Sequence, residues 1–413
     1  MLDGLSFFGS FMNIVFYRPF SDIWFKNPTR RILSRQKLPN KYSGLFDYLS
    51  ENGSASISTA LWFRPGILGL FDLLKDSLRL ILWALLNRIN LFKVRLIFTS
   101  KQLHKADAVF LMHYGCFTHE STAVAEQGRL LAQRLSGFSI LKIVHMTHFA
   151  YNPRLGSENL RILSPDLLIA ENDLKRNSPF FNKYFGNVSG DFQLLPYVAA
   201  PRFQRKVDFR ARSNKLGVTG SITYKMKSPE FFDFYGHNEL QPMRRKIYGR
   251  QNELSNFVDS FIYDLDESRR VQEVCGSEAK GHDSSEARAL VQQRNYYNAD
   301  IVEFFNSYRM FAVPEEVCDL PGISFIEGMA CGTAYFGLDN PMYRDIGMVP
   351  GVHYVAYDGT LEHLLERVAY YQQHADELEQ IAEQGYQIAH TTLSSTSVYS
   401  KFLASLERML PRP

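Results

Sequence analysis

The sequence predicts an α/β protein of two domains, each built on a parallel β-sheet. Its 413 residues exceed the length of an ordinary single domain. Short apolar runs alternate with stretches of helical periodicity, which is the pattern of βαβ units. The runs are nearly continuous in apolar character, as expected for strands of a parallel sheet, which are buried on both faces.

The strands of the first domain become recognisable only after residue 105. The apolar runs assigned to strands are 106–112, 139–145 and 166–170, with a short closing segment at 194–198. Residues 121–135 carry Ala, Leu and Val at helical spacing and predict a helix between the first two strands. Residues 1–105 mix short aromatic runs with one amphipathic stretch and do not show this alternation.

The second domain begins after a basic connection at 200–213 that is poor in aliphatic side chains. Its predicted strands are 215–222, 308–313, 334–337 and 352–357. Its predicted helices are 324–331, 361–371, 375–389 and 395–410. The polar stretch 264–294 predicts a solvated loop beside a helix.

Charge and cysteine content exclude several classes of protein. The 46 Lys and Arg residues nearly balance the 43 Asp and Glu residues, so bulk charge does not predict a nucleic-acid partner. The four cysteines form no CxxC pair, which disfavours both a disulfide framework and a zinc site. Asp264 and Asp266 have the spacing of a carboxylate metal site, but the charged stretch around them predicts a helix, so we expect no bound metal.

Residues 66–98 are the most apolar long stretch, yet charged residues interrupt it too often for a membrane span. The run Leu80–Leu86, flanked by Arg79 and Arg88, allows two interpretations. It is either a helix packed in the first domain or a helix that contacts a membrane surface. The N-terminus lacks the pattern of a secretory leader, so we expect a cytoplasmic protein, with peripheral contact at the inner face of the membrane under the second interpretation.

Two carboxylates, Asp319 and Glu327, stand eight residues apart at the entry of a predicted helix. The amino end of a helix attracts phosphate through its unpaired N–H groups, and a carboxylate near that end is suited to the two hydroxyls of a ribose. Small residues follow, including Gly332 before Thr333, and they allow close approach of a ligand. The pattern therefore indicates a nucleotide site, or else an ordinary amphipathic helix with one exposed Glu.

A second cluster follows the first strand of the second domain. Gly220 and Ser221 form a turn at the strand end, where open parallel sheets bind ligands. Arg244 and Arg245 come soon after and are suited to neutralise a phosphate. Asp233 lies among aromatic residues, which favours a raised pKa or a role as nucleophile. The alternative is a surface helix with a basic face.

A third cluster lies in the first domain, where His148 follows a predicted strand and Glu158 is expected in the loop beyond it. Glu158 is a candidate general base for an acceptor hydroxyl, and His148 is a candidate ligand of the acceptor or sugar. A structural role for the histidine is the alternative.

The segment from Asp319 through Gly332 resembles the E-x7-E region of retaining GT-B glycosyltransferases, with Asp319 in the place of the first Glu. The resemblance extends to about residue 410. It implies two Rossmann-like domains whose parallel sheets face across a cleft. It also implies an acceptor domain at 1–208, a donor domain at 209–392 and a last helix at 393–413 that packs back on the first domain. Glu327 would then bind the donor ribose, and Asp319 would lie near the donor sugar.

A more distant similarity, carried by Glu158 and by Asp233 before Gly-His-Asn-Glu, is to bacterial retaining transferases of the acid sugar Kdo. It implies CMP-Kdo as donor, Asp233 as nucleophile or its electrostatic equivalent, and a lipid-linked or oligosaccharide acceptor in surface polysaccharide synthesis. The competing expectations are a UDP- or GDP-hexose donor, a nucleotide-sugar epimerase, or a non-catalytic carbohydrate-binding protein. No cofactor is expected, since the nucleotide-sugar is itself a substrate.

Overall fold

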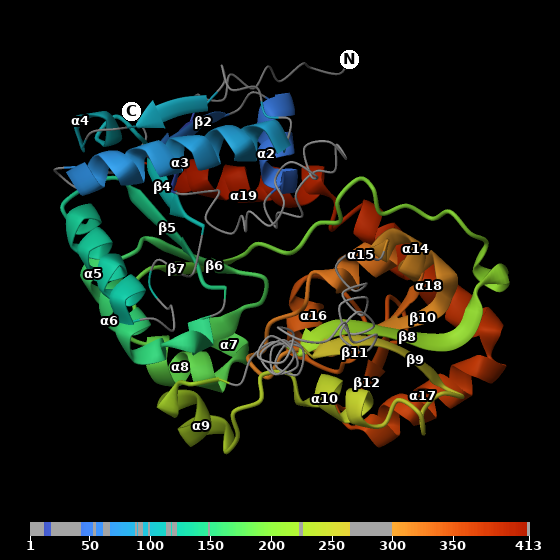
Figure 1. Cartoon of the computed structure of the whole chain (residues 1–413). Coiled ribbons are helices and arrows are strands. Elements are labelled where there is room, and N and C mark those ends of the chain that lie inside the picture. Colours follow the sequence, from blue (N-terminus) through green and yellow to red (C-terminus); the bar gives the residue numbers. More distant parts are fainter. Residues whose placement is uncertain are drawn as a thin grey trace, which may run out of the picture. The chain divides into compact units, whose positions relative to one another are not determined.

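The computed structural model divides the chain into two compact units. Unit 1 comprises residues 1–170, 181–195 and 398–413, and unit 2 comprises residues 171–180 and 196–397. The structure describes residues 12–17, 43–52, 55–60, 67–86, 89, 94–97, 100–112, 117, 122–147, 149–222, 226–264 and 300–410. Figure 1 shows the helices of each unit arranged around its own sheet.

The described residues of unit 1 form a seven-stranded sheet of order β3-β2-β1-β4-β5-β6-β7, in which every neighbouring pair is parallel. The strands are β1 (Met12–Tyr17), β2 (Ala55–Ala60), β3 (Val94–Ile97), β4 (Ala108–Leu111), β5 (Leu141–His145), β6 (Leu167–Ala170) and β7 (Asp191–Leu194). The four residues of β4 and of β6 are all buried, as the continuous apolar runs predict.

The helices that accompany this sheet are α2 (Ser43–Asn52), α3 (Ile67–Leu86), α4 (Ser100–Leu103), α5 (Thr122–Ser136), α6 (Pro153–Leu163), most of α8 (Pro179–Phe185) and most of α19 (Ser395–Met409). Aromatic contacts anchor two of them, because Phe46 of α2 packs on Phe16 of β1 and Phe402 of α19 packs on Phe110 of β4. The last helix of the chain therefore belongs to the first unit.

Unit 2 contains a five-stranded parallel sheet of order β12-β11-β10-β8-β9 among its described residues. The strands are β8 (Ser213–Ile222), β9 (Val258–Asp264), β10 (Tyr308–Ala312), β11 (Ala334–Leu338) and β12 (Val355–Tyr357). The helices are α7 (Leu174–Asn177), α9 (Pro229–Tyr235), α10 (Pro242–Gly249), α14 (Ile301–Ser307), α15 (Ser324–Ala330), α16 (Pro341–Asp345), α17 (Leu361–Gln373) and α18 (Ala375–His390).

The unit boundaries differ from the predicted ones at 208/209 and 392/393. The chain passes from unit 1 to unit 2 at residues 195 and 196 and returns at 397 and 398, and residues 171–180 also belong to unit 2. The basic connection is packed on unit 2, because the Arg212 side chain is almost fully buried there. None of the helices in the described ranges is both long enough and apolar enough to span a bilayer.

Two local predictions are corrected. Glu158 lies in helix α6 instead of a loop, since Pro153 at the first turn starts a helix that continues to Leu163. Asp264 is the last residue of strand β9, which replaces the helix predicted around it. The candidate His148 and the partner Asp266 of the proposed metal pair lie outside the described residues.

Candidate functional site

The carboxyl ends of the unit 2 strands bring together residues that the sequence analysis assigned to two separate clusters. Arg244 of helix α10 donates from Nε to the carbonyl oxygen of Pro314, after β10, over 2.7 Å. It also donates from Nη1 to the carbonyl oxygen of Ser221, near the end of β8, over 2.9 Å. The two carbonyls fix the guanidinium at the edge where parallel sheets bind ligands.

Glycines make room for this guanidinium. Gly220 has φ +146°, and a Cβ there would lie 2.9 Å from the Arg244 Nε atom. A Cβ on Gly322, in the loop between Asp319 and Glu327, would lie 4.0 Å from Arg244 Nη2. Gly220, Ser221 and Arg244 therefore adjoin the loop that carries the two carboxylates, as the predicted nucleotide site requires.

Glu327 lies in the first turn of helix α15 and is half-buried. Burial raises the pKa of its carboxyl to about 7, while the nearby Arg202 and a hydrogen bond from Ser324 favour the ionised form. The Ser324 hydroxyl donates to Glu327 Oε2 over 3.2 Å. The carboxyl therefore titrates close to neutral pH and retains a side open to solvent.

Asp319 has a left-handed backbone with φ +58°, which is uncommon for a residue other than glycine. Burial raises the pKa of its carboxyl, and hydrogen bonds from Ser178 and Asn340 counteract that rise. The Asn172 side chain donates from Nδ2 to the Asp319 carbonyl oxygen over 2.7 Å. Asp319 is thus held through both its side chain and its backbone.

Arg245, the neighbour of Arg244, has a different environment from the predicted one. Its Nε atom lies 2.8 Å from Glu239 Oε1, and its Nη1 atom lies 3.3 Å from Asp264 Oδ2. Two carboxylates compensate its charge in an ion-pair network at the end of β9, and its contact with a donor phosphate stays a prediction.

Gly332 and Thr333 also differ from the prediction that they bind the donor. They precede strand β11 and so lie at the amino ends of the strands, opposite the edge that holds Arg244. Thr333 is fully buried, and its hydroxyl accepts from Arg212 Nη1 over 2.9 Å. Arg212 also donates to the carbonyls of Val207, Cys331 and Gly332.

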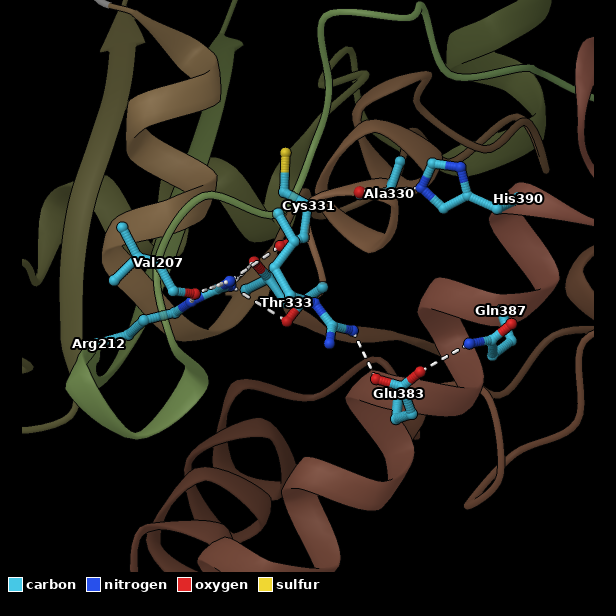
Figure 2. Close-up of polar contacts among 10 residues, drawn as sticks. Val207, Arg212, Ala330, Cys331, Thr333, Glu383, Gln387 and His390 are labelled. Carbon is cyan, nitrogen blue, oxygen red and sulfur yellow. Dashed lines mark hydrogen bonds and ion pairs between the residues drawn. The ribbon is translucent and has the colours of Figure 1, made fainter.

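Figure 2 shows this cluster, with Arg212 extending between Val207, Cys331 and Thr333. Burial lowers the pKa of the Arg212 guanidinium to about 10, because removal from water disfavours its charged form. The guanidinium satisfies carbonyls at the carboxyl end of α15, where cations are favoured. The role of these residues is thus to anchor the helix that carries Glu327.

Glu315 is a functional candidate that the sequence analysis did not identify. It is fully buried just after β10 and accepts hydrogen bonds on Oε1 from the Tyr335 hydroxyl over 2.9 Å, from the Tyr343 hydroxyl and from the Leu338 amide over 3.0 Å. Burial raises the pKa of its carboxyl. Glu315 therefore joins the carboxyl end of β10 to β11 and α16. Its position directly after an apolar strand and Pro314 was the available signal.

The remaining catalytic candidates lie at exposed positions. Asp233 is exposed on helix α9 of unit 2, and Glu158 is exposed on helix α6 of unit 1. Their proposed chemistry stays a prediction. Within the described residues, no group of three or more His, Cys, Asp or Glu side chains is arranged to hold a metal ion.

The C-terminal part of the chain matches a known family model. Residues 250–404 match the family described as "Glycosyl transferase-like", and this range includes both Asp319 and Glu327. Residues 250–404 are thus similar to a glycosyltransferase domain. No curated protein matches the chain.

Solved structures similar to the whole chain show the fold. Sucrose-phosphate synthase from Thermosynechococcus elongatus aligns with a TM-score of 0.52 and 11% identity, over 96% of this chain and 99% of that chain. A glycosyltransferase from Rickettsia africae ESF-5 aligns with a TM-score of 0.50 and 11% identity, over 97% and 99%. The catalytic domain of starch synthase IV from Arabidopsis thaliana, bound to ADP and acarbose, aligns with a TM-score of 0.50 and 8% identity, over 97% and 99%. The predicted GT-B fold is confirmed.

Proposed function

We propose that this glycosyltransferase of GT-B fold transfers a sugar from a nucleotide-activated donor to a glycan acceptor, with retention at the transferred carbon. The observation that carries the proposal is the convergence of Arg244 and the Asp319–Glu327 loop at the carboxyl edge of the unit 2 sheet. The glycosyltransferase domain match covers the same loop. Binding a donor and stabilising its leaving phosphate at one edge is what sugar transfer requires.

In this proposal Arg244 contacts the donor phosphate. Its Nε and Nη1 atoms are held by backbone carbonyls, which are neutral and leave the positive charge uncompensated. Among the residues that the structure describes, no carboxylate forms an ion pair with it. A guanidinium positioned in this way stabilises the charge that develops on a departing phosphate.

Glu327 accepts hydrogen bonds from the two ribose hydroxyls in its ionised form. Its carboxyl titrates near pH 7, so a bound ribose shifts it towards the carboxylate. Asp319 is assigned to the donor sugar, where its half-buried carboxyl is suited to hydroxyl or ring contacts. Asp233 is assigned to the reacting centre as nucleophile or electrostatic equivalent, and Glu158 to the acceptor hydroxyl as general base.

Two classes of donor are distinguished by experiment. The similarity around Asp233 favours CMP-Kdo. The fold shared with starch synthase IV, a protein bound to ADP in its structure, favours a nucleoside-diphosphate hexose such as a UDP- or GDP-sugar. Mass-detected transfer from a panel of CMP-, UDP- and GDP-sugars decides between them. Turnover with a UDP-hexose and none with CMP-Kdo would remove the Kdo proposal.

An epimerase and a carbohydrate-binding protein are separated from a transferase by two further measurements. Conversion of the nucleotide-sugar without any acceptor would indicate an epimerase. Retained biological activity in a folded Glu327→Ala, Asp233→Ala double variant would indicate a non-catalytic carbohydrate-binding protein.

Glu327→Ala provides the direct test of the nucleotide site. Loss of a charged hydrogen-bond acceptor should weaken nucleotide binding by about 1–3 kcal/mol, measured by calorimetry. Glu366→Ala, on an exposed position of helix α17, is the matched control. Equal nucleotide affinity in the two variants would contradict the assignment.

The acceptor is proposed to be lipid-linked, as for bacterial surface polysaccharides, and helix α3 is proposed to contact the membrane. Along α3 four large apolar side chains are exposed at helical spacing: Leu74, Leu78, Ile81 and Leu85. The opposite positions Leu80 and Ala84 are buried in unit 1. An apolar face of this kind, with Arg79 and Arg88 flanking Leu80–Leu86 in the sequence, suits the surface of an anionic bilayer.

Vesicle flotation tests this contact. The wild type should float with vesicles rich in anionic lipid, and Leu78→Glu should not, whereas Glu126→Gln on the exposed face of helix α5 should behave as the wild type. Equal flotation of wild type and Leu78→Glu would refute membrane contact through α3.

A further inference from the structure

We propose that residues 171–180, which we call the clasp, form part of the donor-binding site, with Asn172 and Ser178 as positioning residues for Asp319. The clasp follows strand β6 of the first sheet in sequence, yet its contacts place it in unit 2. This inference rests on the proposed function, because it assigns the clasp to the same site.

The clasp holds Asp319 at two points. Asn172 donates to its carbonyl oxygen over 2.7 Å, and Ser178 donates to its carboxylate. Asn340, which precedes helix α16, is the other donor to that carboxylate. Two of the three side chains that fix Asp319 therefore come from the clasp.

These contacts support a conformation that the backbone does not favour by itself. Asp319 has φ +58°, a region that residues with a side chain rarely adopt unless their surroundings impose it. The hydrogen bond to the carbonyl oxygen fixes the peptide that follows Asp319, and the bonds to the carboxylate fix χ1 and χ2. The clasp thus determines where the carboxylate points.

The clasp is itself fixed. Asn172 and Ser178 are fully buried, so their hydrogen bonds are not exchanged with water. Asn177 donates to Asn172 Oδ1 over 2.7 Å and to Asp345 Oδ2 over 2.5 Å. Arg176 forms an ion pair with the same Asp345. Helix α16 therefore holds the clasp from the side that also supplies Asn340.

Aromatic packing joins the end of the clasp to helix α9. Phe180 is fully buried and stacks on Tyr235 with ring centroids 5.4 Å apart and an interplanar angle of 22°. It also meets Phe234 edge to face at 5.2 Å. Helix α9 carries the candidate Asp233, so a single ten-residue segment contacts the loop of Asp319 and the helix of Asp233.

Three features distinguish this arrangement from ordinary packing. Two buried polar side chains of the clasp, Asn172 and Ser178, both form hydrogen bonds with Asp319, one with its carbonyl oxygen and one with its carboxylate. That residue has a strained backbone. It also lies eight positions before Glu327, in the loop that passes Arg244. Strain held in place by buried hydrogen bonds is a frequent property of functional sites.

The experiment compares Asn172→Ala and Ser178→Ala with two controls in the turn between α10 and β9, Asn252→Ala and Ser255→Ala, whose parent side chains are exposed. Hydrogen exchange of the segment 313–323 is measured without donor. Donor KM and kcat are then measured with the nucleotide-sugar that the wild type uses.

We expect faster exchange of residues 313–323 in both clasp variants. The loss in kcat/KM should be at least about tenfold for Ser178→Ala, the scale of one buried hydrogen bond to a charged group, and about threefold to tenfold for Asn172→Ala, whose bond is to a neutral carbonyl. A double variant of Ser178→Ala with Asp319→Asn should lose no more activity than Asp319→Asn alone, since Ser178 acts through Asp319. Melting temperatures establish that each variant is folded.

The clasp proposal is overturned by wild-type exchange and wild-type kinetics in the clasp variants, or by additive effects in the double variant. Its failure is distinguishable from failure of the proposed function. If the wild type neither binds a nucleotide nor transfers a sugar, the donor site itself is wrong. If the wild type is active and the clasp variants match the controls, only the clasp is wrong.

Discussion

Replacing Glu327 by Gln tests whether burial keeps this carboxyl close to neutrality. Its pKa lies at about 7 in the folded chain, against 4.5 for an unperturbed glutamate. The folded state therefore binds the proton more tightly than the unfolded state. Below the unfolded pKa the carboxyl is neutral in both states. As pH rises towards 7, the unfolded state gains from ionisation and the folded chain loses stability.

The size of the effect follows from the size of the pKa shift. A rise in the Glu327 pKa from 4.5 to about 7 corresponds to about 3 kcal/mol in the free energy of unfolding, if the whole shift contributes. Because the side chain keeps some contact with solvent, we expect about 1–3 kcal/mol. Gln has nearly the same shape and cannot ionise, so its variant should lack this loss.

Chemical denaturation of both chains at about pH 5 and about pH 8 measures the effect. The contributions of the other titrating groups cancel when the free energy of unfolding of Glu327→Gln is compared with that of the wild type. Between about pH 5 and about pH 8, the free energy of unfolding of the variant should rise relative to that of the wild type by about 1–3 kcal/mol. A difference independent of pH, or a shift in favour of the wild type, would show that burial does not raise this pKa.

The other predictions concern Asp319, Arg212 and Tyr343. Asp319→Ala and Asp319→Gly both remove the carboxylate, but only glycine adopts φ +58° without strain. The Gly variant should therefore be the more stable by about 1 kcal/mol in urea denaturation. The opposite order would contradict the left-handed backbone at this position. Arg212→Lys removes the planar guanidinium that donates hydrogen bonds to several buried carbonyls, and it should destabilise the chain by about 3 kcal/mol in the same assay. Arg202→Lys, at an exposed position, is the control and should change the stability little. Tyr343→Phe removes one hydroxyl donor from buried Glu315 and should cost about 1–3 kcal/mol; an unchanged unfolding midpoint would show that the bond is unimportant.

Most strands were predictable where burial on both faces leaves a continuous apolar run. The segments 106–112, 166–170 and 308–313 correspond to β4, β6 and β10. Strands β1, β2, β3 and β9 were not predicted. The residues of β2 are Ala-Ser-Ile-Ser-Thr-Ala, too small and polar for an apolar run, and β3 has four residues of which only the last is buried. Their place in the sheet beside β1 depends on contacts that no local pattern encodes.

The candidate site was predictable where its residues are close in sequence. The spacing of Asp319 and Glu327 was visible directly, and the grouping of Gly220 and Ser221 with Arg244 followed from the rule that ligands bind at strand ends, although the two residues belong to strand β8 and not to the predicted turn. For Arg245, next to Arg244, the sequence did not reveal the ion pairs with Glu239 and Asp264, because no local pattern links it to either partner.

The contacts of the clasp were outside the reach of local patterns. Asn172 and Asp319 are 147 positions apart, and their hydrogen bond depends on the tertiary fold. One signal was present, because Glu171, Asn172 and Asp173 are polar residues directly after the buried strand β6. Polar residues at that place in a parallel sheet are suited to a site.

The clasp also determines how the chain can be divided for laboratory work. A recombinant fragment containing residues 196–397 would include every strand of the second sheet but omit the ten residues that complete its polar network. Cutting the gene at the apparent linker would therefore give a protein with Asp319 deprived of two of its three supports. A synthetic peptide of residues 171–180, added in trans or fused through a flexible spacer, is the natural complement to such a truncation.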